Sequence, residues 1–145
     1  MNNTSTVRFE TTEVGQVLPA LQKTVTVAQI RSYAQASGDR NPIHLDDAFA
    51  RSVGLPGVIA HGMLTLAFAN QMLTDWLGTS GRLTRLDGRF GGMVVPGDEV
   101  TCSARVAKKD AESRRVGFDL TLTNQRGEKV LTKAVAEAEF PKPKE

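Results

Sequence analysis

The chain has 145 residues, of which 40% are hydrophobic and 23% are charged, and its formal net charge is +2. These values are typical of one globular domain, and at this length roughly two thirds of the unfolded surface can be buried in a core. The basic residues are scattered among acidic ones rather than gathered in a stripe, so the charge does not indicate a nucleic-acid partner.

Cys102 is the only cysteine, so the chain cannot form an intramolecular disulfide. It alternates with the apolar residues Val100, Ala104 and Val106, and no histidine or second cysteine stands near it in the sequence. We therefore expect a buried and unreactive thiol.

Two segments of the sequence bear on the cellular location of the protein. The first ten residues are polar and lack the apolar segment of a signal peptide, so we expect a cytoplasmic protein. Residues 52–74 carry no formal charge, but Pro56 and Gly57 interrupt them and His61 would be unfavourable in lipid. This stretch therefore predicts a buried helix and no membrane partner.

The first half of the chain predicts helices after a short strand at residues 24–26. From Val27 apolar residues recur at helical spacing, with Thr26 as N-cap and Gly38 as the residue that ends the helix. Pro42 makes residues 39–44 an unfavourable continuation of that helix. A second short helix is predicted from about residue 46 to 53, because acidic side chains stand in its first turn.

Residues 58–77 are the longest helical segment, and residues 54–57 before it form a loop. Apolar side chains occur on nearly every side of this helix, which predicts that it is buried all round. Residues 78–81 end it.

The remainder, from Arg82 onward, predicts strands. Apolar and polar residues alternate along 100–106, 116–123 and 130–140, with turns at 96–98 and 125–127. In the last strand we expect Ala134, Ala136, Ala138 and Phe140 on the inner face and Lys133, Glu137 and Glu139 on the outer face.

Helices followed by antiparallel strands predict an α+β fold, in which a curved sheet wraps around the apolar helix. We expect a single domain over residues 1–140 and a disordered tail over residues 141–145, which read Pro-Lys-Pro-Lys-Glu. The sequence contains no internal repeat.

The segment between Gly38 and His44 concentrates three unlike polar side chains: Asp39, Asn41 and His44. A carboxylate and an imidazole on a loop stiffened by Pro42 suit general acid–base chemistry, provided that burial raises the pKa of the carboxylate towards neutral pH. Residue types alone fit an ordinary turn better, since Asp, Asn and Pro are common there. A metal site built from Asp39, His44 and His61 is a third interpretation, but no pair stands at a ligand spacing such as i, i+4.

Gly62 is the second notable residue, near the start of the apolar helix. In the first turn its N–H would be unsatisfied and could hold a developing oxyanion. Close packing explains a glycine there equally well. We interpret His61, directly before it, as structural.

Residues 33–50 resemble the hydratase-2 signature of the MaoC-like dehydratase family, within the hot-dog superfamily. The signature is an aromatic residue, a short spacer, a small or aliphatic residue, then Ser/Thr-Gly-Asp-x-Asn-Pro-aliphatic-His, and a small residue six positions later. The matching residues are Tyr33, Ala36, Ser37, Gly38, Asp39, Asn41, Pro42, Ile43, His44 and Ala50. Ala36 departs from the usual larger aliphatic residue or Gly. The similarity continues through 60–64, 89–90 and 96–98, and is especially close to small actinobacterial (3R)-hydroxyacyl-thioester dehydratase subunits and short (R)-specific enoyl-CoA hydratases.

This resemblance implies a hot-dog fold with a helical overhang that carries the catalytic loop. It also implies a hydro-lyase that interconverts trans-2-enoyl and (R)-3-hydroxyacyl thioesters of CoA or acyl carrier protein in fatty-acid metabolism. Asp39 and His44 would be the catalytic pair, Asn41 would support their geometry, and the Gly62 N–H would hold the thioester oxygen. The implied enzyme needs no metal and no redox cofactor, because the thioester itself stabilises the enolate.

The resemblance implies a dimer whose sheets join edge to edge, either a homodimer or a heterodimer in which this chain is the catalytic subunit. A hot-dog thioesterase and a non-catalytic acyl-binding subunit are the alternatives. Neither the acyl length nor the carrier follows from the sequence. Four basic residues flank the turn near residue 112 and could meet phosphates, although a solvated turn explains them better: Lys108, Lys109, Arg114 and Arg115.

Overall fold

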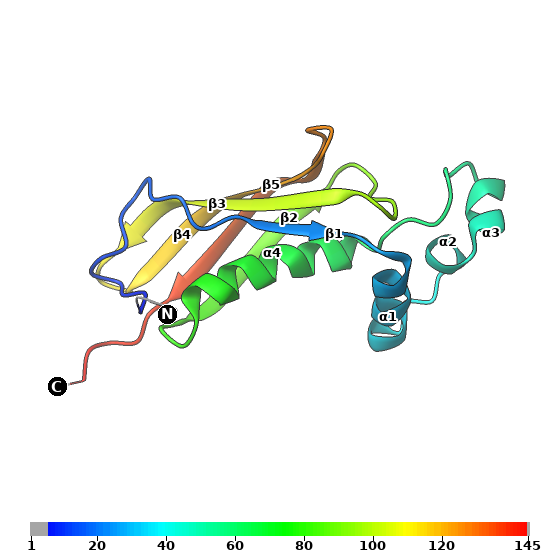
Figure 1. The fold of residues 1–145 in the computed structure, drawn as a ribbon. Helices are drawn as coiled ribbons and strands as arrows, with labels where there is room; N and C mark the ends of the chain where they lie inside the picture. The colour runs from blue at the N-terminus through cyan, green and yellow to red at the C-terminus, as the bar shows by residue number, and fades with distance from the viewer. Residues whose placement is uncertain (1–5, 145) are drawn as a thin grey trace, which may run out of the picture.

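The computed structural model describes residues 6–144. The elements in chain order are β1 (Leu21–Thr24), α1 (Val27–Ser37), α2 (Pro42–Leu45), α3 (Asp47–Ser52), α4 (Gly62–Leu77), β2 (Arg82–Phe90), β3 (Glu99–Asp110), β4 (Arg115–Asn124) and β5 (Lys129–Glu139). Within these residues the strands form one antiparallel sheet of five, in the order β1-β3-β4-β5-β2. The sheet lies across α4, while α1, α2 and α3 gather beyond one end of it (Figure 1). This agrees with the expected α+β sheet wrapped around a helix.

The predicted strand faces are confirmed. Along β3 and β4 every second side chain is buried against α4: Val100, Cys102, Ala104, Val106, Val116, Phe118, Leu120 and Leu122. In β5 the expected inner residues are buried as well: Ala134, Ala136, Ala138 and the following Phe140. Lys133 is exposed with φ 50 next to a register shift, so β5 contains an irregularity that alternation alone does not reveal.

Helix α4 begins at Gly62, four residues later than predicted. The N–H groups of Ile59 and Ala60 instead donate to Ile43 O (3.1 Å) and Val94 O (2.8 Å), which holds the segment before the helix away from helical geometry. The spacing of apolar residues in the sequence does not reveal tertiary hydrogen bonds of this kind. The first helix is confirmed at Val27–Ser37, with Thr26 as its cap, whereas the short strand lies at residues 21–24 rather than 24–26.

The expectation that this long helix is buried all round is wrong for the single chain. One face packs on the sheet through Leu64, Phe68, Met72 and Leu73, among others. A stripe on the other side is exposed and contains Met63, Ala67, Asn70 and Thr74. The stripe is mostly small or polar, so a count of apolar residues overestimates how much of the helix the sheet covers.

Residues 1–5 of the expected domain and residue 145 of the expected tail lie outside the described residues. Residues 141–144 are exposed and form neither helix nor strand, although Pro141 O accepts a hydrogen bond from Arg114 (2.9 Å). Disorder of the tail therefore stays a prediction. No helix within residues 6–144 has both the length and the apolarity to cross a membrane.

Burial of Cys102 in β3 leads to a first prediction. The side chain is 1% exposed, and burial raises the pKa of the thiol to about 12, against a small opposing effect of Lys23. The nucleophilic thiolate is therefore scarce at pH 8. We expect no reaction with a disulfide-exchange reagent in the folded protein and one equivalent in denaturant. Rapid labelling of the native chain would contradict the buried position.

Asp98 joins the loop before β3 to the β4–β5 turn. Its carboxylate accepts hydrogen bonds from Gln125 (2.8 Å), from Val95 N–H (3.1 Å) and from Arg126 (3.2 Å), and the residue is 3% exposed. Burial alone would raise the pKa of Asp98, but these three hydrogen bonds and the positive charge of Arg126 together outweigh it and lower the pKa below 3.8. The same loop carries Val94, whose carbonyl holds Ala60 just before α4.

We expect Asp98→Asn to lower the free energy of unfolding at pH 7 by about 2 kcal/mol, because hydrogen bonds to a charged acceptor are lost. Since the folded pKa is the lower one, the carboxylate's contribution is fully present well above pH 4 and disappears as the pH falls through the folded pKa. Urea unfolding at pH 7 and at pH 3 measures this. An equal difference between the two proteins at both pH values would contradict it.

Candidate active site

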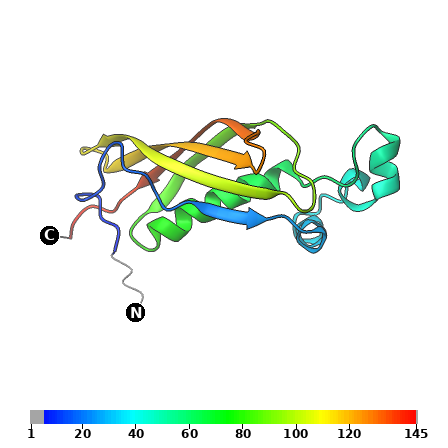
Figure 2. The same ribbon diagram turned by 45° about the horizontal axis from the view of Figure 1, so that its top comes forward.

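The site lies at the end of the sheet where α4 begins, between α4 and the group formed by α1, α2 and α3 (Figures 1 and 2). Helix α1 ends at Gly38, whose φ of 79° is the left-handed conformation that glycine adopts readily. The chain turns there, and Asp39 follows directly after the turn. Ser37 Oγ accepts the Asp39 N–H (3.1 Å) and steadies this turn.

Residues 42–45 form the short helix α2, although a helix was not expected across this segment. Pro42 is tolerated because it occupies the first turn, where a helix has no use for its missing N–H. Asn41 keeps the extended conformation that precedes proline (φ −56°, ψ 130°), and its side chain caps the helix by accepting the Ile43 N–H (3.2 Å). The cap orients α2, which carries His44.

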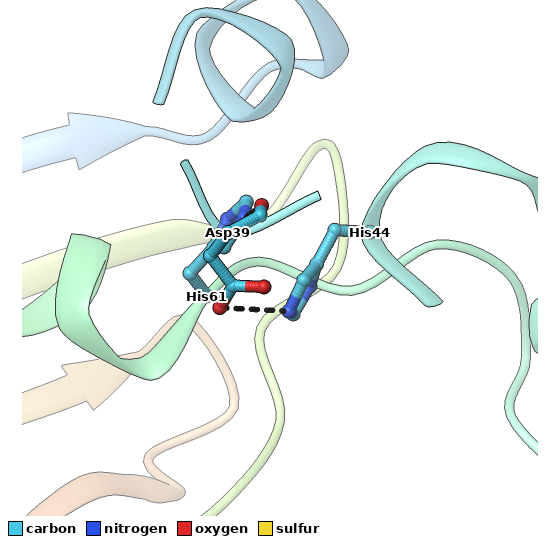
Figure 3. A group of neighbouring side chains, drawn as sticks. All are labelled: Asp39, His44 and His61. Atoms are coloured by element: carbon cyan, nitrogen blue, oxygen red, sulfur yellow. Dashed lines mark hydrogen bonds and ion pairs between the residues drawn. The ribbon is translucent and has the colours of Figure 1, made fainter. Parts of the chain in front are cut away.

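Asp39 and His44 lie side by side (Figure 3). Asp39 Oδ2 is 4.0 Å from His44 Nε2, and Asp39 Oδ1 accepts the Asn41 N–H (3.2 Å). Asn41 therefore acts on both members of the pair: its main chain holds the carboxylate and its side chain caps the helix of the imidazole. The structure thus brings together all three polar residues that the loop sequence singled out.

The tautomer of His44 follows from its other contact. Its Nδ1 is 2.7 Å from Ile59 O, and a carbonyl oxygen can only accept, so Nδ1 carries the hydrogen. In the neutral ring the lone pair is then on Nε2, the atom that faces Asp39. His44 is 8% exposed, so its ring is held firmly while this nitrogen remains next to the carboxylate.

The side chain of Asp39 is 55% exposed in the single chain. The acid–base interpretation of the sequence assumed a buried carboxylate, and this chain alone does not bury it. Three apolar side chains are also open to solvent, at the start of α4, at the end of β2 and in the segment after β2: Met63 (54%), Phe90 (55%) and Met93 (49%).

Gly62 is the first residue of α4, as its proposed role requires. An N–H at this position has no acceptor inside the helix, and no residue among 6–144 accepts it. A Cβ at this position would meet the Phe90 ring at 3.0 Å. The free N–H and the close approach of Phe90 thus occur together, so the close packing of the glycine is confirmed and its role as an oxyanion donor stays a prediction.

The sequence grouped His61 with Asp39 and His44 only as a possible metal site and otherwise as structural, and it did not predict the contacts that His61 makes with the pair. It is 2% exposed, its Nε2 is 2.9 Å from Asp39 O, and its ring stacks on the His44 ring with 3.7 Å between centroids. Tyr33 packs edge-on against the same ring at 4.8 Å. A separation of 22 residues from Asp39 conceals this contact. The available signal was a histidine followed by a glycine at the start of an apolar helix.

Asp39, His44 and His61 each offer one possible metal-ligand atom, and these atoms lie within 4.8 Å of one another. The lone pair of a ring nitrogen lies in the plane of its ring, and the two planes are nearly parallel (23°) and stacked. Two stacked rings do not direct their lone pairs at one ion about 2.0–2.1 Å from both nitrogens. The donor set is therefore gathered in space but oriented poorly for a shared metal.

The four basic residues near residue 112 lie at the opposite end of the molecule, where the β3–β4 hairpin turns (Figure 1). Arg114 pairs with Glu10 (3.0 Å) and Arg115 with Glu137 (3.3 Å). A hollow of about 450 Å³ lies at this end as well, lined by residues such as Thr79, Arg82 and Lys142. These features are distant from Asp39 and His44, so they belong to no site that contains the pair.

Comparison with known proteins places this chain in a family. Residues 8–126 match the MaoC like domain. The fatty acid synthase subunit beta of Aspergillus oryzae is 45% identical over 76 residues, which are 50% of this chain and 4% of that protein. The 3-hydroxyacyl-thioester dehydratase X of Mycobacterium tuberculosis is 38% identical over 106 residues, 73% of this chain and 34% of that protein. The chain thus spans far less than half of the length of either relative.

Two solved structures match over most of both chains. The (R)-hydratase from A. caviae involved in PHA biosynthesis has a TM-score of 0.84 at 29% identity, with 91% of this chain and 99% of that chain covered. A chain of the ChsH1-ChsH2 complex from Mycobacterium tuberculosis has a TM-score of 0.80 at 25% identity, covering 90% and 99%. The chain therefore has the hot-dog fold and belongs to the MaoC-like domain family.

Proposed function

We propose that this chain is a hydro-lyase that interconverts trans-2-enoyl and (R)-3-hydroxyacyl thioesters, with Asp39 and His44 as its catalytic pair. The observation that carries the proposal is the 4.0 Å approach of Asp39 Oδ2 to the lone-pair nitrogen of His44. The names of the A. caviae hydratase and the mycobacterial dehydratase support the same reaction class.

The gap between the two groups suits a water molecule. A water about 2.8 Å from both atoms fits beside the line that joins them. In hydration its oxygen forms a bond to C3, the C2=C3 π bond breaks, one water proton goes to the pair, and one proton goes from the pair to C2. Dehydration is the reverse. The two groups share these protons as a coupled unit, so we assign the transfers to the pair.

The Gly62 N–H completes the proposed mechanism. When water adds to C3, negative charge develops on the thioester oxygen, and an unoccupied N–H at the positive end of α4 is suited to receive it. The thioester carbonyl itself takes up this charge, so the reaction needs no redox cofactor. Asn41 supports the pair through its N–H to Asp39 and through its cap on α2.

The test is turnover of crotonyl-CoA. We expect the absorbance of the enoyl thioester to fall without release of free thiol, and the product to be oxidised by an (R)-specific but not an (S)-specific 3-hydroxyacyl-CoA dehydrogenase. Thiol release instead would indicate a thioesterase. Binding of the thioester without turnover, in both the isolated chain and any purified complex, would indicate a non-catalytic subunit. The same assay with crotonyl-acyl carrier protein, and with longer enoyl chains, identifies the preferred carrier and acyl length.

We further propose that a second subunit covers the site, in a homodimer or in a heterodimer with a related chain. Strand β2 is an open edge of the sheet, which a second subunit could pair with. Four exposed residues lie at or beyond the end of this strand: Asp39, Met63, Phe90 and Met93. The mycobacterial ChsH1-ChsH2 structure is a complex of two named chains. Light scattering of the purified protein measures the assembly: twice the chain mass supports the homodimer, and a monomer inactive until a related chain is added supports the heterodimer.

A further inference from the structure

His61 lies in the segment directly before α4, where its side chain meets three parts of the site at once. Its Nε2 is 2.9 Å from Asp39 O, its ring face covers the His44 ring at 3.7 Å, and Tyr33 of α1 packs edge-on against it at 4.8 Å. Gly62 follows it in the chain. One buried side chain therefore touches both members of the proposed pair and is adjacent to the proposed oxyanion donor.

The tautomer of His61 is set by the bond to Asp39. The carbonyl oxygen of Asp39 only accepts, so Nε2 carries the hydrogen and the neutral ring has its lone pair on Nδ1. That Nδ1 is buried and has no hydrogen-bond partner among the described residues. His44 has the opposite tautomer, because its Nδ1–H donates to Ile59 O.

The unsatisfied Nδ1 argues against a purely structural role for His61. A buried polar atom without a partner lowers stability, and an apolar ring of similar shape would fill the same space without that loss. The packing therefore does not explain the histidine. What an apolar ring cannot supply is the Nε2–H bond to the main chain of Asp39.

We infer that His61 is a positioning residue, which sets the separation of the Asp39 carboxylate, the His44 imidazole and the Gly62 N–H. Its hydrogen bond fixes the main chain of Asp39, and its ring face fixes the plane of His44. The inference rests on the proposed function, since it gives His61 a role in that reaction. In this role His61 acts through Asp39, His44 and Gly62 rather than on the substrate.

Three substitutions separate the hydrogen bond from the stacking. His61→Gln places a carboxamide N–H close to the position of Nε2 but removes the ring. His61→Asn is its matched control, because its carboxamide is one methylene shorter and falls short of Asp39 O. His61→Phe keeps a ring against His44 and removes the donor.

We expect His61→Asn and His61→Phe to lower kcat for crotonyl-CoA by about 10²-fold, as small misplacements of reacting groups do. We expect KM to change less than about three-fold and His61→Gln to recover at least ten-fold of the loss in kcat. Thermal unfolding of each variant gives its folded fraction, to which kcat is normalised. A merely structural residue would change the unfolding temperature and leave the normalised kcat unchanged, which would overturn the inference. Equal kcat values in the Gln and Asn variants would overturn it as well.

A spectroscopic measurement tests the geometry independently of turnover. The chain contains only two histidines, His44 and His61. A two-bond ¹⁵N–¹H spectrum of the tag-free protein should therefore show one ring with Nδ1–H and one with Nε2–H, assigned by His61→Gln. An Nδ1–H tautomer at His61 would overturn the inference. If the tautomers are as expected but the wild-type chain and its complexes do not hydrate enoyl thioesters, the proposed function fails while the positioning geometry stands.

Discussion

Replacing Asp39 by Asn or His44 by Ala is expected to lower kcat for enoyl-thioester hydration by about 10²–10⁴-fold, the usual contribution of a positioned acid or base. Asn at position 39 keeps an oxygen for the Asn41 N–H, so the turn of the loop survives while the proton acceptor is lost. Ala at position 44 removes the nitrogen that faces Asp39. Because the two groups act as a unit, the double variant should be little slower than the slower single variant.

Steady-state kinetics on crotonyl-CoA with Asp39→Asn, His44→Ala and the double variant measures this effect. Asp119→Asn is the matched control, because Asp119 is an exposed carboxylate in β4, outside the overhang that carries the pair. We expect the control to keep full activity. Strictly multiplicative losses would show that the two groups do not act together, and full activity in both single variants would disprove the pair.

The sheet could be predicted well because its signal is local. Alternation in residues 100–106 and 116–123 follows from one covered and one open face, and the structure has both. The start of α4 could not be predicted from the sequence. The N–H groups of Ile59 and Ala60 donate hydrogen bonds to the carbonyl groups of Ile43 and Val94, which are distant in sequence. The exposed face of α4 was missed because small residues such as Ala67 count as apolar whether or not anything covers them.

Part of the candidate site could likewise be predicted from the sequence, and part of it could not. Asp39, Asn41 and His44 stand within six residues, so one loop places them together, and their pattern is recognisable in the sequence. His61 enters from another segment, and only the fold reveals that it stacks on His44. The exposure of Asp39 is also beyond a sequence argument, because the burial of that carboxylate depends on how the surrounding segments pack, and in the single chain they leave its side chain 55% exposed.

Replacing Gly62 by Pro is expected to lower kcat by about 10²–10³-fold, the effect of removing one oxyanion donor. Proline lacks the N–H and fits the first position of a helix, where its fixed φ suits the turn. The preceding His61 already has the extended conformation that proline requires of its neighbour (φ −63°, ψ 138°). The substitution should therefore remove the donor and leave α4 folded.

The added Cβ is a separate perturbation, because it would meet Phe90 at 3.0 Å. Gly62→Ala introduces the same atom but keeps the N–H, so the ratio of kcat between the Ala and Pro variants isolates the donor. Both substitutions are repeated with Phe90→Leu, which reduces the contact with that Cβ. We expect the ratio to persist in this second background, with circular dichroism showing equal helix content. If Pro is as active as Ala in either background, Gly62 is a glycine only because Phe90 lies against it.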